Sequence, residues 1–192
     1  MKQSAASWSL ENRGEALVRE SLEEYCNNND AHVLNCVTLR LEDGSTTQID
    51  HILISTKGIF VIETKHYQGW ILGHSRAKFW AQIIYKNKYF FQNPTFQNHK
   101  HTKEIQRILD FLEPQLIHNF VVFSGDSIFK RKKIERVFHK EELTREIDKY
   151  PDGKISLNRV QFCVGRLEYM RLKISRKTDV EHQAYLMQKF GR

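Results

Sequence analysis

The stretch that decides the fold is Gln48-Ile49-Asp50-His51-Ile52-Leu53-Ile54-Ser55-Thr56-Lys57-Gly58-Ile59-Phe60-Val61-Ile62-Glu63-Thr64-Lys65. Residues 48–54 and 59–65 are rich in β-branched and aromatic residues, which favour strands. Residues 56–58 lie between them and are typical of a turn. We therefore predict an antiparallel hairpin. Its second strand begins with four apolar residues in succession, which is typical of a strand covered on both faces.

The register of this hairpin decides whether Asp50 faces Glu63. With a two-residue loop, Ser55 faces Gly58, and Asp50 falls opposite Glu63 on the same face of the sheet. If Gly58 instead forms a bulge after a three-residue turn, the register slips by one and Asp50 lies opposite residue 64. The sequence leaves both registers open. Glu63 and Lys65 share a face in either case, because side chains alternate along a strand.

Asp50, Glu63 and Lys65 suit the hydrolysis of phosphodiesters. Mg²⁺ prefers carboxylate oxygens and keeps several waters, so both acids are candidate ligands of Mg²⁺ or Mn²⁺. An ammonium group beside a metal and a phosphate orients the attacking water and offsets the charge of the transition state. The alternative is an ordinary cross-strand ion pair on a solvated face. An acid and a lysine in a strand covered on both faces favour the functional interpretation.

Together with residues before and after it, this hairpin makes the chain resemble the nuclease-related domain (NERD) family, a branch of the PD-(D/E)xK nuclease superfamily, over about residues 13 to 125. The resemblance rests on the order and spacing of Gly14-Glu15, Gln48 to Ile52, Gly58 to Lys65, Gly69-Trp70-Ile71, Trp80, Asn93-Pro94 and Gln97. It implies an α/β fold with a restriction-endonuclease-like core, in which a central mixed β-sheet is flanked by helices. It also implies a metal-dependent nuclease site on the central strands.

The resemblance assigns roles residue by residue. The metal-binding acids of the superfamily correspond to Asp50 and Glu63, and its lysine to Lys65. Glu15 resembles an additional acid on the first helix that reaches the metal or its waters. Gln97 resembles a polar residue of the next helix that faces the site. Ile49 stands where a proline is usual, at a position that is not a ligand. The expected catalytic residues are Asp50, Glu63, Lys65, Glu15 and Gln97, with Asp50, Glu63 and Glu15 at the metal.

Composition points to one soluble domain with a basic surface. The 192 residues are 40% hydrophobic and 28% charged, which is ordinary globular usage with a sizeable core. The 30 Lys and Arg against 23 Asp and Glu give a formal charge of +7. This excess favours polyanionic partners.

The cysteines and the N-terminal residues indicate an intracellular protein. Cys26, Cys36 and Cys163 are scattered, so they support neither a disulfide framework nor a thiolate zinc site. Residues 1–10 lack the apolar core of a signal peptide, and no apolar run approaches the roughly 20 residues of a membrane helix. We expect a cytoplasmic protein without membrane contact.

Periodicity and turn signals predict the remaining elements of the core. Val18, Leu22 and Tyr25 recur at helical spacing within residues 11–28. A helix with Ile105, Ile108, Leu109 and Leu112 on one face begins at a cap, either Asn93 or Thr95, and ends near Pro114. The predicted strands are residues 32–41, short strands within 70–91 with turns at 73–75 and 87–88, and residues 117–123.

Residues 1–125 are therefore predicted to form the nuclease core, and residues 126–192 a mostly helical C-terminal extension packed on it. This extension is not expected to be an independent domain. Its predicted elements are a charged loop at 130–133, a short strand at 134–138, and helices near 139–149, 156–170 and 178–190.

Two basic clusters are weaker candidates for nucleic-acid contacts, namely Lys86 and Lys88 at a hairpin tip and the run Lys130, Arg131, Lys132 and Lys133. The tip lies near Tyr85, Tyr89 and Phe90, which would allow a base to stack. Core aromatics with a solvated tip are the favoured alternative for the first cluster. A solvated surface loop is the favoured alternative for the second.

The histidines are interpreted as structural or surface residues. His99 and His101 lie two apart on a predicted helix and so face different directions, which makes a poor chelate. His51 and His66 alternate away from their acidic neighbours and are expected on the opposite face of the sheet.

Three functional hypotheses follow. The favoured one is a Mg²⁺- or Mn²⁺-dependent nuclease that acts on DNA, with RNA as a second candidate substrate and a homodimer as the arrangement for cutting both strands. The second is a nucleic-acid binding module that keeps the fold and hydrolyses nothing, and the complete set of Asp50, Glu63 and Lys65 argues against it. The third is an interaction or structural domain with an incidental basic surface.

Overall fold

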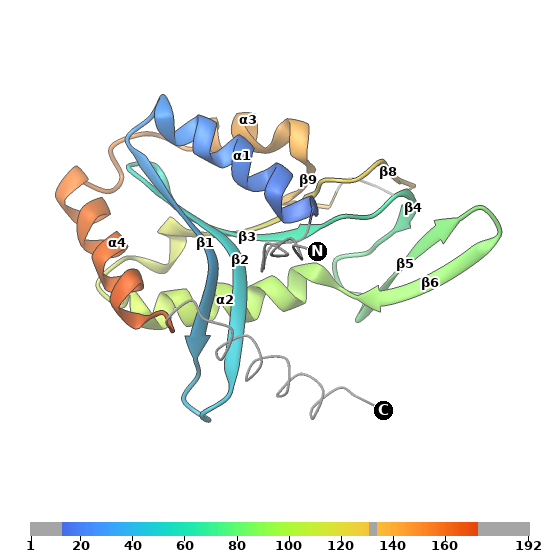
Figure 1. Ribbon diagram of the computed structural model, residues 1–192, viewed down its shortest axis with the longest axis horizontal. Coiled ribbons are helices and arrows are strands. Elements are labelled where there is room, and N and C mark those ends of the chain that lie inside the picture. Colours follow the sequence, from blue (N-terminus) through green and yellow to red (C-terminus); the bar gives the residue numbers. More distant parts are fainter. Residues whose placement is uncertain (1–12, 131–133, 173–192) are drawn as a thin grey trace, which may run out of the picture.

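The structure is a computed structural model that describes residues 13–130 and 134–172. Its centre is a five-stranded sheet with the strand order β1-β2-β3-β7-β9 (Figure 1). The strands are β1 (Ala31–Arg40), β2 (Thr46–Ser55), β3 (Gly58–Lys65), β7 (Ile117–Phe123) and β9 (Val137–His139). The β1–β2 and β2–β3 pairs are antiparallel, whereas the β3–β7 and β7–β9 pairs are parallel. The sheet is therefore mixed.

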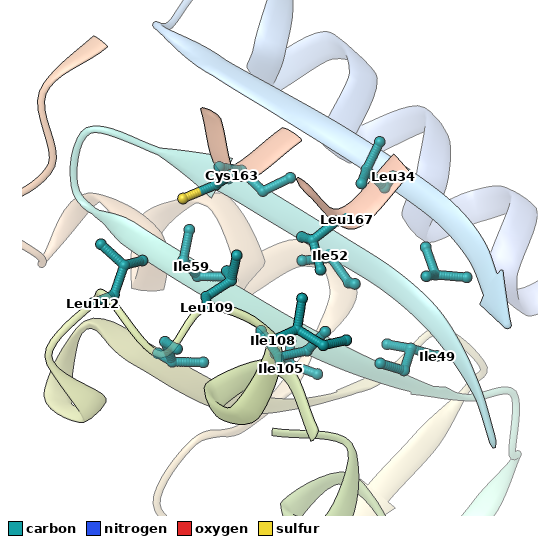
Figure 2. Close-up of a cluster of buried hydrophobic side chains, with 14 of the residues drawn as sticks. Leu34, Ile49, Ile52, Ile59, Ile105, Ile108, Leu109, Leu112, Cys163 and Leu167 are labelled. Atoms are coloured by element: carbon teal, nitrogen blue, oxygen red, sulfur yellow. The ribbon is translucent and has the colours of Figure 1, made fainter. Parts of the chain in front are cut away.

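Helices cover both faces of this sheet (Figure 1). On one face, α1 (Arg13–Asn27) and α3 (Leu143–Asp148) enclose a core that includes Leu22, Phe60 and Phe120. On the other face, α2 (Pro94–Ile108) and α4 (Leu157–Met170) pack on β2 and β3 through a second core (Figure 2). β3 lies between the two cores, and every residue from Gly58 to Thr64 is buried. The expectation of a strand covered on both faces is confirmed.

A smaller sheet lies at one edge of the molecule, with the order β6-β5-β4-β8 (Figure 1). Its strands are β4 (Gly69–Leu72), β5 (Phe79–Ile84), β6 (Asn87–Gln92) and β8 (Ser127–Phe129). The predicted turn at 87–88 is wrong, because Ile84 pairs with Asn87 and the loop consists of residues 85 and 86. Tyr85 takes a positive φ of 53° there. This register places Trp80 opposite Phe91, where both rings reach the core.

Residues beyond 125 take part in both sheets. β8 pairs with β4, β9 pairs with β7, and α3 and α4 pack on opposite faces of the central sheet. Short 3₁₀ turns at Pro114–Leu116 and Lys140–Glu142 connect these elements. The domain boundary at 125 stays a prediction, and the helix predicted at 178–190 lies outside the described residues.

The predicted fold class is confirmed: an α/β fold with a central mixed sheet flanked by helices and a helical C-terminal part. The helix predicted at 11–28 is observed at Arg13–Asn27, and the strand predicted at 117–123 has those bounds. Across residues 13–130 and 134–172, no helix is long and apolar enough to cross a membrane.

The core also contains a neutral histidine that makes the stability of the fold depend on pH. His118 packs between the rings of Phe60 and Tyr150, with ring centroids 4.9 and 4.1 Å away. Among the described residues, its buried Nε2 has no hydrogen-bond partner. Burial, aided by Arg136, lowers the pKa of His118 to about 4. Protonation therefore favours the unfolded chain.

We expect the contribution of His118 to stability to fall as the pH decreases from the pKa of an unfolded histidine, about 6.5, to the folded value of about 4. The loss from His118 is at most about 1.4 kcal/mol per pH unit. Urea unfolding across this range measures it. His118→Phe keeps the ring contacts and should reduce the pH dependence of the midpoint. Equal pH dependence in both proteins would contradict the assignment.

Candidate active site

The β2–β3 hairpin has a two-residue loop, so the first of the two predicted registers is confirmed. Ser55 pairs with Gly58, and the Ser55 hydroxyl donates to the Gly58 carbonyl at 3.1 Å. Gly58 has a φ of 151°, and a Cβ there would lie 2.9 Å from the Leu116 carbonyl oxygen, so a larger residue does not fit. The ladder extends to the pair of His51 and Ile62. In this register the next residue, Asp50, faces Glu63.

The side chain of Asp50 caps the end of this ladder. Its Oδ2 accepts a hydrogen bond from the Thr64 N–H at 2.7 Å. On the other side, the β1–β2 ladder skips the position of Asp50, between the pairs Asn35–His51 and Val37–Ile49. Cys36, which stands opposite, has a positive φ of 51°. A strained residue and an interrupted ladder therefore lie beside the first predicted acid.

Glu63 and Lys65 form an ion pair on one face of β3. The Lys65 Nζ donates to Glu63 Oε1 at 2.5 Å and to Gln97 Oε1 at 3.3 Å. Only 3% of the Glu63 side chain is exposed. Its second oxygen, Oε2, is buried and accepts no hydrogen bond from the described residues, with His101 Nδ1 3.6 Å away. Glu63 therefore has one carboxylate oxygen that no described donor satisfies by a hydrogen bond.

The pKa values follow from burial and from these neighbours. Burial raises the pKa of Asp50 well above its usual value, and the charges of Glu63 and Glu15 raise it further. The Thr64 N–H and the Lys65 ammonium oppose this effect. For Lys65, burial acts to lower the pKa, but the charge and hydrogen bond of Glu63 outweigh it, and the pKa is raised. The site thus contains three carboxyl groups, those of Asp50, Glu63 and Glu15, which is more than the single charge of Lys65 can neutralise.

A close approach of α1 to the end of β3 brings Glu15 to this site. Gly14 is buried, and a Cβ at its position would lie 2.4 Å from the Cβ of His66 and 2.8 Å from the Ser124 hydroxyl. Only glycine allows the first turn of α1 to lie this near the strand end. The pair Gly14-Glu15 therefore combines a contact that needs glycine with the acid that this contact positions.

The first turn of α2 is held over β3 and β7 by two asparagines. Asn93 is the N-cap, as one of the two predictions had it, and its side chain accepts from the Thr95 N–H at 3.0 Å. Asn98 is fully buried and donates to the Val61 and Phe120 carbonyls, each at 2.8 Å. These bonds fix the helix over the parallel strands. Gln97 is thereby directed at Lys65.

The five predicted catalytic residues meet at one cavity of about 560 Å³. Its lining consists of Arg13, Glu15, Asp50, Glu63, Thr64, Lys65, His66, Tyr67 and Gln97. Among the described residues, no group of three or more His, Cys, Asp or Glu side chains is arranged to hold a metal ion. Glu15 therefore lines the cavity without forming a three-carboxylate cluster with Asp50 and Glu63.

Comparison with known proteins agrees with this geometry. The family model of the nuclease-related domain matches residues 10–124, which is more than half of the chain. The chain belongs to the nuclease-related domain family. This membership supports a nuclease-type function.

The chain is also similar to two individual proteins. An uncharacterized protein of Bacillus anthracis is 36% identical over 185 residues, covering 93% of this chain and 84% of the relative. Among solved structures, the 5-hydroxymethylcytosine-specific restriction enzyme AbaSI is similar at 15% identity and a TM-score of 0.31. That match covers 94% of this chain and 51% of the enzyme, so the chain spans about half of the enzyme's length.

His101 belongs to this nuclease-related domain site and was missed in the sequence. It is buried beside Glu63, whereas His99 is exposed, so the two histidines do face different directions. His101 lies four residues after Gln97, which places both on one face of α2. The spacing of four residues from Gln97 is the sequence signal for His101, and it is overlooked when His101 is compared only with His99. His51, as expected, points away from the acids, and its Nδ1 lies 2.7 Å from Asn35 Oδ1. The same expectation is wrong for His66, which lines the cavity together with the acids.

The predicted nucleic-acid contacts that the structure describes, Lys86, Lys88 and Lys130, do not line the cavity of this nuclease-related domain. Lys86 and Lys88 are at the end of the β5–β6 hairpin, and Lys130 follows β8. Arg131, Lys132 and Lys133 lie outside the described residues. The expectation that the aromatics of the hairpin are core residues is wrong: Tyr85, Tyr89 and Phe90 are exposed. Of the aromatic residues of this hairpin, only Trp80 and Phe91 pack against the core.

The crowding of acids predicts that the site reduces the stability of the metal-free fold. Asp50→Asn removes one charge and keeps an oxygen that accepts the Thr64 N–H. Because ionised Asp50 is disfavoured in the folded state, the variant should melt higher in EDTA at neutral pH. Each kcal/mol gained corresponds to about 2–4 °C in a chain of this size.

Asp148→Asn is the matched control. Hydrogen bonds from Lys57 at 2.6 Å and from the Tyr25 hydroxyl at 2.9 Å stabilise this carboxylate, and the bond from Lys57 contributes most to lowering its pKa. Neutralising it should leave the melting temperature unchanged or lower it. A melting temperature of Asp50→Asn below that of the wild type would contradict the expected repulsion.

Proposed function

We propose that this chain is a divalent-metal-dependent nuclease that hydrolyses phosphodiester bonds of DNA. The observation that carries the proposal is the buried carboxylate of Glu63, one oxygen of which is paired with Lys65 while the other has no hydrogen bond from the described residues. A buried charged oxygen without a partner is costly in a purely structural site. It is expected where a cation binds.

The donor set suits Mg²⁺ or Mn²⁺. Asp50 and Glu63 offer hard carboxylate oxygens at the cavity wall, and Mg²⁺ is held in many proteins by one or two carboxylates while it keeps several waters. Glu15 would act through such waters. A bound divalent cation would supply positive charge against the scissile phosphate and lower the pKa of a water molecule.

The other residues would position the reacting groups. The ammonium of Lys65 is fixed by Glu63 and Gln97 at the cavity wall, where it can orient the attacking water and offset the negative charge that develops on the phosphate. Asp50 is in turn held by the Thr64 N–H. His101 limits the rotation of the Glu63 carboxylate from the other side.

The substrate side of the proposal rests on charge. The basic excess favours a polyanion, and the proposed phosphate contacts are Lys86, Lys88, Lys130, Arg131, Lys132 and Lys133. RNA is a second candidate substrate for the same chemistry. A homodimer would bring two cavities to one duplex and would allow both strands to be cut in one encounter.

We expect purified protein to degrade DNA in Mg²⁺ or Mn²⁺ and not in EDTA. Glu63→Ala and Lys65→Ala should each reduce the rate by about 100-fold or more, because each removes charge that acts in the transition state. Linear, closed circular and single-stranded DNA and an RNA of the same sequence, followed on gels, separate the substrate classes. Lys149→Ala, at an exposed lysine far along the chain, should cut at the wild-type rate.

Cutting that persists in EDTA or in both variants would overturn the proposal. If the protein binds nucleic acid but cuts none with any of the metals tested, the hypothesis of a nucleic-acid binding module without hydrolysis would be favoured instead.

Metal should also stabilise the fold. A ligand that binds only the folded state adds about 2.7 kcal/mol of stability at 100 times its Kd. We therefore expect the melting temperature to rise with Mg²⁺ concentration in the wild type and to stay constant in Glu63→Ala. Glu141→Ala, at an exposed acid, should retain the wild-type response. An unchanged wild-type melting temperature at high Mg²⁺ would count against the metal site.

A further inference from the structure

Three strands of the small sheet, β4, β5 and β6, form an insertion that begins and ends at the cavity, whereas β8 follows β7. The chain leaves the cavity at Tyr67, forms β4, β5 and β6, and returns to it at Gln97. The Tyr67 ring packs against Phe91 of β6 at a centroid distance of 4.7 Å. The insertion is therefore attached to the cavity wall at both of its ends and through this ring contact.

The two faces of this sheet differ in burial. On the inner face, Ile71 and Trp80 pack against Phe123 of the central sheet. The register places other side chains on the outer face, because Trp70 pairs with both Ile83 and Ile128, and Phe90 pairs with Ala81. The exposed fractions on this outer face are 48% for Trp70, 55% for Phe79, 70% for Phe90 and 54% for Ile128.

Lysine ammonium groups lie over the aromatic rings of this outer face. Lys130 Nζ is 4.2 Å from the Trp70 ring centroid, and Lys88 Nζ is 4.9 Å from that of Phe90. A third pair, Lys78 and Phe79, is separated by 5.6 Å. Flat rings and cations thus alternate on one surface, and this combination binds bases by stacking and phosphates by charge.

The charge of the whole segment has one sign. Residues 64–103 contain seven Lys and Arg and no Asp or Glu. The fourth strand, β8, is preceded by the exposed Asp126 and followed by Lys130, so positive charge still predominates on the small sheet, which suits a polyanion. A second copy of this chain would bring the same positive face against itself, which is unfavourable.

We propose that the outer face of the small sheet binds unpaired bases of single-stranded DNA beside the cavity. Trp70 and Phe90 stack the bases, and Lys88 and Lys130 contact the phosphates. A flat ring stacks only on a base face that a duplex keeps covered, so the surface favours single strands over duplexes. The inference deepens the proposed function by naming the form of nucleic acid that reaches the cavity, but the binding itself does not require cutting.

The test is equilibrium binding in EDTA, where the metal-dependent cutting proposed above is stopped. Fluorescence anisotropy of a labelled single-stranded oligonucleotide of about 15 nucleotides is compared with that of its duplex. Trp70→Ala and Phe90→Ala should each weaken single-strand binding by roughly tenfold and duplex binding much less. Trp70→Phe keeps a ring and should recover most of the affinity. Because these side chains are exposed, melting temperatures should stay near that of the wild type.

Tyr169→Ala is the matched control, since Tyr169 is an exposed aromatic residue on α4, outside the small sheet. It should bind single strands as the wild type does. Unchanged single-strand binding in Trp70→Ala and Phe90→Ala, or equal losses for single strands and duplexes, would overturn the proposal. So would self-association that Phe90→Ala abolishes, because the face would then dock a second copy.

The two proposals fail separately. Lys65→Ala should retain single-strand binding while it loses cutting. If the protein cuts DNA while Trp70→Ala and Phe90→Ala bind single strands as the wild type does, the nuclease proposal holds and the stacking proposal is wrong.

Discussion

The burial of one carboxylate, Glu63, is the constraint on which the rest of the structure depends. A charge inside a strand that is covered on both faces loses most of its hydration, and the cost is several kcal/mol unless partners replace the water. Lys65 satisfies one oxygen of Glu63, and Gln97 holds Lys65 in turn. The second oxygen accepts no hydrogen bond from the described residues. The fold therefore carries the cost of one unsatisfied buried carboxylate oxygen, and strain of this kind is common at functional sites.

The polar contacts around β3 hold the helices next to the carboxylate of Glu63. Asn98 bonds to carbonyls of β3 and β7 at once, so α2 cannot slide along the parallel pair without losing buried hydrogen bonds. On the opposite face, Gly14 lets α1 touch the strand end. The two longest described helices thus begin at one cavity, with the positive ends of their dipoles near the gathered acids. Packing on each face and electrostatics at the end of β3 are consequences of the same arrangement.

The central hairpin was predictable because its signals are local and mutually consistent: apolar runs, a short turn and alternation around Glu63. The cavity lining was predictable only through the family motif, since Glu15, Glu63 and Gln97 are far apart in the chain. His101 escaped because its role arises from helix docking, although its spacing from Gln97 was visible. The turn at 85–86 escaped because a tyrosine with positive φ carries no turn signal, and the burial of Trp80 decides the register there. The exposure of the hairpin aromatics depends on which parts of the small sheet are covered by other elements. A local sequence pattern does not predict this tertiary packing.

The proposed chemistry and the proposed recognition therefore occupy two sheets with different physical demands. The acids need a buried and rigid frame, because a carboxylate that moves loses both its partner and its ligand geometry. A stacking surface needs exposed rings, which would be a liability in solution without the lysines that cover them and keep the surface charged. Because β4, β5 and β6 are inserted between two wall segments of the cavity and β8 lies at the far edge of their sheet, the outer face can change in sequence without disturbing the buried contacts of Glu63. If both proposals hold, substrate preference and the cutting centre are free to vary separately in a chain of this architecture.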